Sequence, residues 1–192
     1  MANVQYRRGC FYHVYNRGVN RGRIFFRQEN YAFFIRRMRK YVAPEQAQII
    51  AYCLMPTHYH LFVQVHADDV FGDAVMQPFM TSYVKAVNKE QDRVGPLFQG
   101  KYKAILVDDD AYFTHLSRYI HVNPVVAGYV DNAEDWPFSS YRDYLGLRQG
   151  TIPQSDVILR RFGAVAAYRR FVEGTDYAPP RKFKRWLDET VE

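Results

Sequence analysis

The segment THYHLFVQV carries two histidines, His58 and His60, separated by one residue. Its β-branched and aromatic residues predict a strand over residues 58–66, in which alternate side chains point to the same face. Both imidazoles therefore share a face with Phe62, Gln64 and His66, while the other face is an apolar stripe of Tyr59, Leu61, Val63 and Val65. Neutral imidazoles this close can bind one divalent ion together. A histidine pair on an ordinary polar surface strand would show the same pattern.

A second pair of polar residues, Tyr119 and Asn123, lies one helical turn apart in the segment RYIHVN. Helical spacing over residues 111–122 places both on the flank of an apolar stripe formed by Phe113, Leu116 and Ile120. Side chains on this flank would point toward the sheet that the apolar stripe covers. A phenol there is a slow nucleophile unless its electrophile is activated, because roughly one part in a thousand is ionised at neutral pH.

The two pairs together predict metal-dependent phosphoryl transfer. A divalent ion held by His58, His60 and Asn123 would polarise a phosphate oxygen and stabilise the leaving oxygen, with Tyr119 as the nucleophile. Two imidazole nitrogens and one amide oxygen suit Mg²⁺ or Mn²⁺, and Zn²⁺ remains an alternative on these ligands.

Other residues of the same segment could take part in this chemistry. Tyr112 is a rival nucleophile two turns before Tyr119 on nearly the same face, and His115 lies between them as a surface or substrate-contacting residue. His121 points nearly the opposite way. The acids at 108–110 could be imagined as metal ligands, but their position predicts a cap for the helix start.

The elements that must position these residues can be read from hydrophobic periodicity and turn residues. The sequence predicts strands over 11–18, 46–56, 58–66 and 97–107, the middle two forming a hairpin. It predicts helices over 29–42, with Asn30 as cap, over 72–91, where Pro78 either kinks or begins the helix, and over 111–122, ended by Pro124. This order indicates an α+β fold of ferredoxin-like type, an antiparallel sheet with flanking helices.

The C-terminal part predicts a smaller appendage. Short helices are expected within residues 134–146 and 155–174, followed by a basic tail from residue 179. We therefore divide the chain into a catalytic domain over 1–147 and a C-terminal helical extension with its tail over 148–192.

Composition narrows the class of protein. The longest apolar run, residues 49–55, is too short to cross a membrane, and the two cysteines lack metal-site or disulfide-framework spacing. These features predict a cytoplasmic protein with reduced thiols and no membrane partner.

Charge favours a polyanionic partner. The chain has a formal charge of +6, and residues 1–40 hold ten Lys and Arg against one acid. Basic side chains bind nucleic acid by neutralising phosphates and releasing counterions, and those on the helix at 36–40 could equally be a solvated face. We expect contacts to such a polyanion from Arg17, Arg21, Arg23, Gln64, Lys101 and Lys103.

Three segments resemble a known family. THYHLFVQV is similar to the histidine-hydrophobic-histidine motif of the HUH single-strand endonucleases. FYHVYNRGVNRGRIFF and the region from LFQGKYKAILV to WPFSSYRDYLG resemble the REP-associated tyrosine transposases, relatives of single-tyrosine insertion-sequence transposases. The resemblance covers roughly residues 5–147.

The resemblance implies a function and a partner. A helix-borne tyrosine, here Tyr119, would attack single-stranded DNA near the hairpins of REP (repetitive extragenic palindromic) elements, giving a 5′-phosphotyrosine and a free 3′-hydroxyl that later reverses the link. The metal ligands would be His58 and His60, with Asn123 where relatives often carry glutamine. Thr57 stands where the family usually has asparagine. Monomer and homodimer both remain open.

Two other classes of protein fit the same residues. The chain could be a nucleic-acid-binding module on a ferredoxin-like sheet that never cleaves, so that binding would need no divalent ion. It could also be a metal-dependent hydrolase of another substrate, in which turnover through water would leave no protein adduct.

Overall fold

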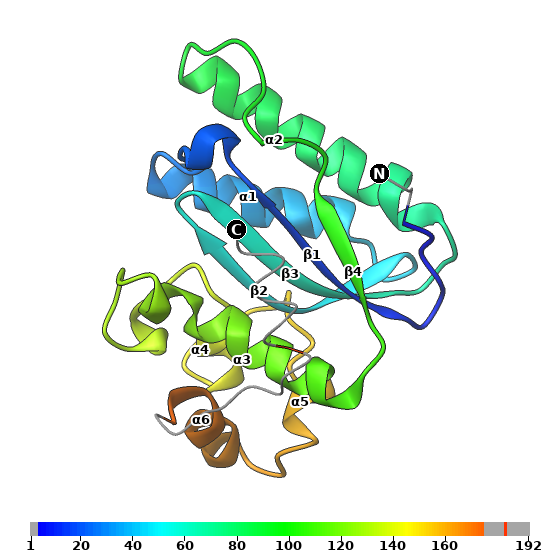
Figure 1. Ribbon diagram of the computed structural model, residues 1–192, viewed down its shortest axis with the longest axis vertical. Coiled ribbons are helices and arrows are strands. Elements are labelled where there is room, and N and C mark those ends of the chain that lie inside the picture. The colour runs from blue at the N-terminus through cyan, green and yellow to red at the C-terminus, as the bar shows by residue number, and fades with distance from the viewer. Residues whose placement is uncertain (1–3, 175–182, 184–192) are drawn as a thin grey trace.

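The computed structural model describes residues 4–174 and Phe183. Its sheet contains β1 (Phe11–Arg17), β2 (Ala47–Met55), β3 (His58–Val65) and β4 (Lys103–Val107) in the order β2-β3-β1-β4, with every neighbouring pair antiparallel (Figure 1). Helix α1 (Gln28–Tyr41) joins β1 to β2, and α2 (Gln77–Glu90) joins β3 to β4. The predicted α+β fold of ferredoxin-like type is confirmed.

Helices cover both faces of this sheet (Figure 1). On one face α1 and α2 pack through aromatic side chains, where the Phe34 ring lies 5.2 Å from Tyr59 and 4.7 Å from Phe79. On the other face lies α3 (Asp110–Val126), whose Phe113 ring is 5.1 Å from that of Phe62. The histidine-bearing face of β3 is therefore largely buried beneath α3, where sequence alternation alone indicated a polar face.

The β2–β3 hairpin agrees with its prediction and is held by the loop after β1. The turn between its strands consists of Pro56 and Thr57, and the Thr57 carbonyl accepts a hydrogen bond of 2.8 Å from the Gly18 N–H. A Cβ at Gly18 would lie 2.1 Å from the carbonyl oxygen of Gly22, so only glycine fits this close backbone approach. The basic loop is thereby fixed beside the hairpin turn.

Two helix starts differ in detail from the sequence prediction. Asn30 is the third residue of α1 rather than its cap, and its Oδ1 accepts hydrogen bonds from the backbone of Phe26 and Arg27. It satisfies the free amides of the helix start from inside the first turn. Pro78 marks the beginning of α2, one of the two alternatives, and a π-helical turn over Phe71–Met76 precedes it.

The strand predicted over 97–107 is shorter in the structure. It begins at Lys103, and before it only Phe98 forms an isolated bridge, with Gly18. The Asn16 side chain donates a hydrogen bond of 3.0 Å to the Gly100 carbonyl. Residues 97–99 instead pair with the end of β1 and the loop after it, where the Val19 N–H donates to the Leu97 carbonyl and the Gln99 N–H to the Arg17 carbonyl.

The helix predicted to end before Pro124 continues to Val126. Proline has no N–H for the carbonyl of Ile120, yet the helix goes on because the Ala127 N–H bonds the Asn123 carbonyl at 3.0 Å. Asn123 consequently keeps a helical conformation. Asp109 caps the start by accepting a hydrogen bond from the Tyr112 N–H, which confirms capping by the acidic run.

After α3 the chain folds back over the same face of the sheet. The short elements are η3 (Ala133–Asp135), α4 (Tyr141–Tyr144), α5 (Asp156–Leu159) and α6 (Val165–Glu173). Tyr144 and Tyr168 belong to one buried cluster although they lie on opposite sides of the predicted boundary at 147/148. That boundary stays a prediction, and the basic tail from 179 falls outside the described residues except for Phe183.

Two expectations drawn from composition bear on the described part of the chain. Cys10 and Cys53 are both free thiols, the first half-buried and the second buried. No helix within residues 4–174 combines the length and the apolar character that a membrane crossing requires.

Candidate active site

Strand β3 places both histidines on the face covered by α3. The His58 and His60 rings are 5.1 Å apart, and His60 is 5% exposed whereas His58 is half-buried. The antiparallel register sets Arg17 of β1 opposite His58 and Tyr15 opposite His60. A cationic side chain therefore shares a face with the pair.

Helix α3 brings the two predicted partners to these histidines. The Oδ1 atom of Asn123 lies 3.1 Å from Nε2 of His58, and the Tyr119 ring lies 5.2 Å from the His60 ring. Residues 119 and 123 are one turn apart on the same side of the helix, so the packing of α3 on the sheet directs both side chains toward the histidines. The structure thus gathers into one cluster all four side chains that the sequence predicted for the chemistry.

Burial controls the protonation of this cluster. It lowers the pKa of His60 well below its usual value, with further contributions from His58 and His13, and it also lowers the pKa of His58. Both imidazoles are therefore neutral near pH 7, which a metal ligand must be. Burial raises the pKa of Tyr119, and its hydrogen bond with Asn123 acts in the opposite direction. The phenol is held in its protonated form.

The donor set and its spacing fit a divalent ion. Two ligands on adjacent corners of an octahedral Mg²⁺ ion, with bonds of about 2.1 Å, are about 3.0 Å apart. The separation of Asn123 Oδ1 and His58 Nε2, 3.1 Å, agrees with that edge. No group of three His, Cys, Asp or Glu side chains among the described residues could hold a metal ion. The amide oxygen of Asn123 is therefore the protein group available to complete a two-histidine site.

A third histidine, His13 of β1, is part of the cluster and was missed by the sequence analysis. Its Nε2 lies 2.9 Å from Nδ1 of His60, and it is 1% exposed. Burial lowers the pKa of His13 to about 3. Alternation in the first strand already places His13 on the same face as Tyr15 and Arg17. The sequence does not show which strand pairs with this one, so the contact between His13 and His60 could not be predicted.

The rival residues of α3 are directed elsewhere. The Tyr112 ring packs 5.4 Å from Phe183, and burial raises the pKa of its phenol. The His115 ring is half-buried and lies 5.5 Å from Phe171. For neither side chain does the structure give a ring contact with His58 or His60. Tyr119 is thus the tyrosine of this helix that contacts the histidine pair.

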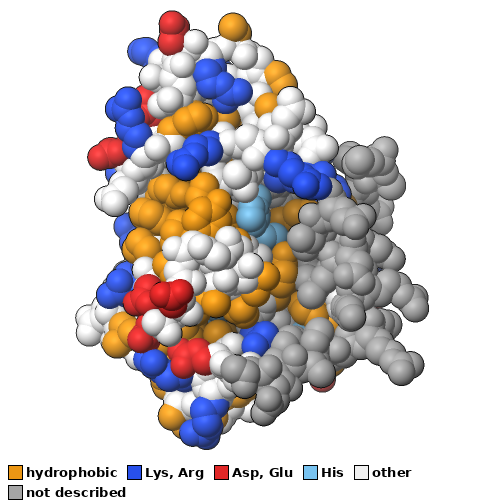
Figure 2. All heavy atoms as spheres, turned by 60° about the vertical axis from the view of Figure 1, so that its left-hand side comes forward, with side chains coloured by type: hydrophobic (Ala, Val, Ile, Leu, Met, Phe, Trp, Pro, Cys, Tyr) orange, Lys and Arg blue, Asp and Glu red, His pale blue; other side chains and the backbone are white. Residues whose placement is uncertain are grey.

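Several basic residues lie on the strands and loops near the histidine cluster. Lys103 of the edge strand β4 is paired with Tyr15 of β1, and the Lys103 Nζ lies 5.8 Å from the Tyr15 ring centre. Arg17 hydrogen-bonds through Nε to Gln99. Arg21, Arg23 and Lys101 are exposed in the adjoining loops. Figure 2 shows histidine at the surface beside a group of Lys and Arg side chains.

Two residues that share the strand pattern are not brought to the cluster. Gln64 accepts a hydrogen bond from Gln48 and donates one to the Gly9 carbonyl, and it is about 20 Å along the strand from His58. Its assignment to DNA contact stays a prediction. The Nδ1 atom of His66 bonds the Pro44 carbonyl at 2.6 Å, beyond the end of β3.

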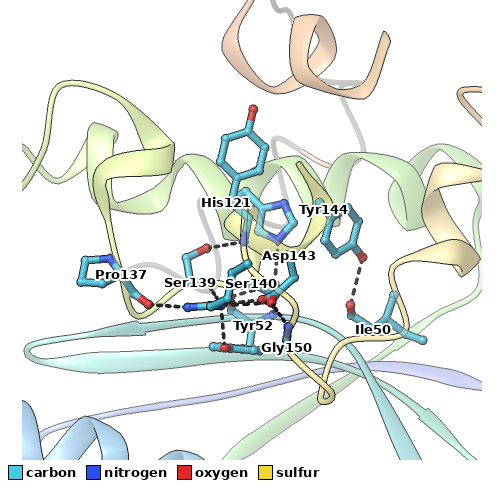
Figure 3. A network of polar contacts seen from close by, with 11 residues as sticks. Ile50, Tyr52, His121, Pro137, Ser139, Ser140, Asp143, Tyr144 and Gly150 are labelled. Atoms are coloured by element: carbon cyan, nitrogen blue, oxygen red, sulfur yellow. Dashed lines mark hydrogen bonds and ion pairs between the residues drawn. The ribbon is translucent and has the colours of Figure 1, made fainter. Parts of the chain in front are cut away.

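The segment that follows α3 packs against the side of this helix opposite Tyr119 and connects it to the sheet. His121, on the opposite side of α3 from Tyr119, bonds Tyr168 through Nδ1 at 2.7 Å and Ser140 through Nε2 at 2.8 Å. The Ser140 hydroxyl in turn accepts a hydrogen bond from the Tyr52 N–H of β2 (Figure 3). This buried network links the tyrosine-bearing helix to the edge strand β2.

A salt bridge stabilises the same segment (Figure 3). The Asp143 carboxylate binds the Arg148 guanidinium at 2.5 Å, and the guanidinium also donates to the carbonyls of Pro137 and Ser139. Since Tyr144 bonds the Ile50 carbonyl of β2 at 2.9 Å, the whole segment is attached to the sheet edge.

The chain belongs to the IS200-like transposase family, whose model matches residues 6–123. That stretch contains the hairpin histidines and extends to Asn123, the last residue of the cluster.

Among known proteins the chain is similar to REP-associated tyrosine transposases. It is 27% identical over 103 residues to a Haemophilus influenzae protein assigned as a REP-associated tyrosine transposase, a match that covers 49% of this chain and 58% of that protein. The chain thus spans little more than half the length of this curated relative. A solved structure of a REP-associated tyrosine transposase bound to a REP hairpin matches with a TM-score of 0.60 at 18% identity, over 76% of this chain and 85% of the other. That match supports the fold.

Proposed function

We propose that the protein is a metal-dependent single-stranded DNA endonuclease and strand transferase that uses Tyr119 as its nucleophile. The observation that carries the proposal is the cluster of two neutral imidazoles, an amide oxygen 3.1 Å from one of them, and a phenol ring 5.2 Å from the other. Membership of the IS200-like transposase family supports the same reaction class.

In this proposal each side chain has a defined task. The Tyr119 phenol oxygen attacks a phosphorus atom of the DNA, the bond to the 3′-oxygen breaks, and a 5′-phosphotyrosine and a 3′-hydroxyl result. The phenol proton leaves to solvent and the departing 3′-oxygen takes up one, so charge balances. One phosphodiester replaces another, which makes the step reversible without an external energy source.

The metal site of the proposal consists of His58, His60 and Asn123, for Mg²⁺ or Mn²⁺. The bound ion would supply Lewis-acid activation of the scissile phosphate, which the protonated Tyr119 needs from its surroundings. His58 and His60 bind through neutral nitrogens. Asn123 has a second task, because its hydrogen bond lowers the pKa of Tyr119.

We further propose that the DNA is a hairpin of REP type with an unpaired flank. Arg17 lies opposite His58 on β1, Lys103 lies opposite Tyr15 on the edge strand β4, and Arg21 and Arg23 are exposed in the segment after β1. Cations around an active site bind a backbone without reading its sequence, which suits the single-stranded flank.

A covalent-adduct assay tests the reaction. Purified protein, Mn²⁺ and a labelled hairpin oligonucleotide with a single-stranded flank should give a protein–DNA adduct that survives denaturation. Tyr119→Phe should abolish the adduct, and His58→Ala or His60→Ala should reduce it at least tenfold. Tyr112→Phe, which alters the other tyrosine of the same helix face, is the matched control and should leave it intact.

The same assay separates the other classes of protein. Binding of the oligonucleotide without an adduct in wild type would identify a non-cleaving module. Cleavage without an adduct would identify hydrolysis by water. An adduct that persists in Tyr119→Phe would refute the assignment of the nucleophile.

A further inference from the structure

We propose that His13 is a positioning residue that holds His60 in the tautomer whose Nε2 binds the metal ion. The inference rests on the proposed function, because it concerns the same metal site. It adds a residue that does not itself bind the ion.

Strand pairing aims His13 at His60. The two residues lie on neighbouring central strands and are diagonal to each other, because His60 is paired with Tyr15 and His13 with Phe62. The ring planes are within 20° of parallel, with centres 5.1 Å apart. His13 Nε2 and His60 Nδ1 are 2.9 Å apart, the distance of a direct hydrogen bond.

Only one proton can lie between these two nitrogens. If His13 donates it, Nδ1 of His60 is the acceptor, and the proton of neutral His60 must then sit on Nε2, where it blocks metal binding. If His60 donates from Nδ1, its Nε2 carries a lone pair. A metal ion at Nε2 therefore requires His13 to be the acceptor, and an acceptor at that point stabilises the ligand tautomer.

His13 is not itself a third ligand. Its Nε2 is directed at Nδ1 of His60, and no group of three His, Cys, Asp or Glu among the described residues could hold a metal ion. Its burial, 1% exposed, holds the ring in one orientation, and the Tyr15 ring stacks on it at 4.8 Å. A residue that acts through a metal ligand must keep its acceptor atom fixed at that ligand. Burial and stacking of the His13 ring do this.

The other histidine shows the same arrangement. Nδ1 of His58 lies 3.0 Å from Oγ1 of Thr57, while its Nε2 faces Asn123. Each imidazole of the pair therefore has its Nδ1 beside a neighbouring side chain. At His58 the Nε2–H donates to Asn123 Oδ1 in the metal-free structure, and an ion bound there would take the place of that proton. Partners of this kind orient metal-bound histidines in proteins, and their loss typically weakens metal binding about 10–100-fold.

Metal affinity measured without DNA tests the inference. Mn²⁺ binding is followed by electron paramagnetic resonance for wild type, His13→Phe and His13→Gln. Phe keeps a ring in the buried site but has no acceptor, so its affinity for Mn²⁺ should fall about tenfold or more. Gln carries a carbonyl oxygen at a similar reach and should restore most of the affinity. Thermal melting establishes that each variant is folded.

His121→Phe is the matched control. It makes the same substitution at a buried, doubly hydrogen-bonded histidine that does not contact the metal ligands. It should lower the melting temperature and leave Mn²⁺ affinity within twofold of wild type. Equal losses of affinity in His121→Phe and His13→Phe would show a general structural effect and overturn the inference.

Nuclear magnetic resonance of ¹⁵N-histidine-labelled, metal-free protein reads the tautomer directly. Wild-type His60 should carry its proton on Nδ1, and His13→Phe should shift protonation toward Nε2. Protonation of wild-type His60 on Nε2, or Mn²⁺ affinity unchanged in His13→Phe, would overturn the inference alone, provided that His58→Ala lowers that affinity. No Mn²⁺ binding by wild type would refute the proposed metal site and this inference together.

Discussion

The buried imidazole of His121 should make the protein less stable in mild acid. Burial lowers the pKa of His121 to about 3, whereas an unfolded histidine titrates near 6.5. Between these values the unfolded chain binds a proton that the folded protein excludes, so the free energy of unfolding falls as pH falls. From pH 7.5 to 5.5 the loss from this one residue is about 1.4 kcal/mol.

Urea unfolding at the two pH values measures this loss in wild type and in His121→Gln. The variant keeps an amide within reach of Ser140 but has no group that titrates in this range. Its stability should fall by about 1.4 kcal/mol less than that of wild type over the same interval. His13, whose pKa burial also lowers to about 3, is present in both proteins and cancels in the difference. The same pH dependence in both would refute the conclusion that His121 is neutral in the fold.

Three further predictions concern residues around the site. Gly18→Ala should cost about 1–3 kcal/mol in urea unfolding, because its Cβ would lie 2.1 Å from the Gly22 carbonyl oxygen; a loss within error would contradict the close approach. Arg17→Gln should weaken binding of single-stranded DNA and reduce the slope of log affinity against log salt by about 1, as fluorescence anisotropy would show; an unchanged slope would mean no phosphate contact. Asp143→Ala should cost about 2 kcal/mol in thermal unfolding because it leaves Arg148 without its carboxylate partner, and a neutral effect would argue against the network.

Local patterns predicted most of the elements around the site. The β2–β3 hairpin follows from strand alternation on either side of a two-residue turn. The placing of Tyr119 and Asn123 on one side of α3 follows from the helical period, so residues close in the sequence determine both. Boundaries that depend on contacts between distant segments were predicted less well. The strand expected from 97 begins at Lys103, where the regular pairing of β4 with β1 starts.

Local sequence patterns were enough to predict the order of the elements, two histidines on one strand face, a tyrosine and an amide one helical turn apart, and a concentration of arginine in the N-terminal part of the chain. Tertiary structure decided which of these side chains meet. Alternation places His13 on a face but does not say which strand lies beside it, and helical spacing does not say that His121 is buried against the C-terminal segment. Pairing between strands and burial under α3 are interactions between residues far apart in the chain, and these set the tautomers, the charges and the distances of the site.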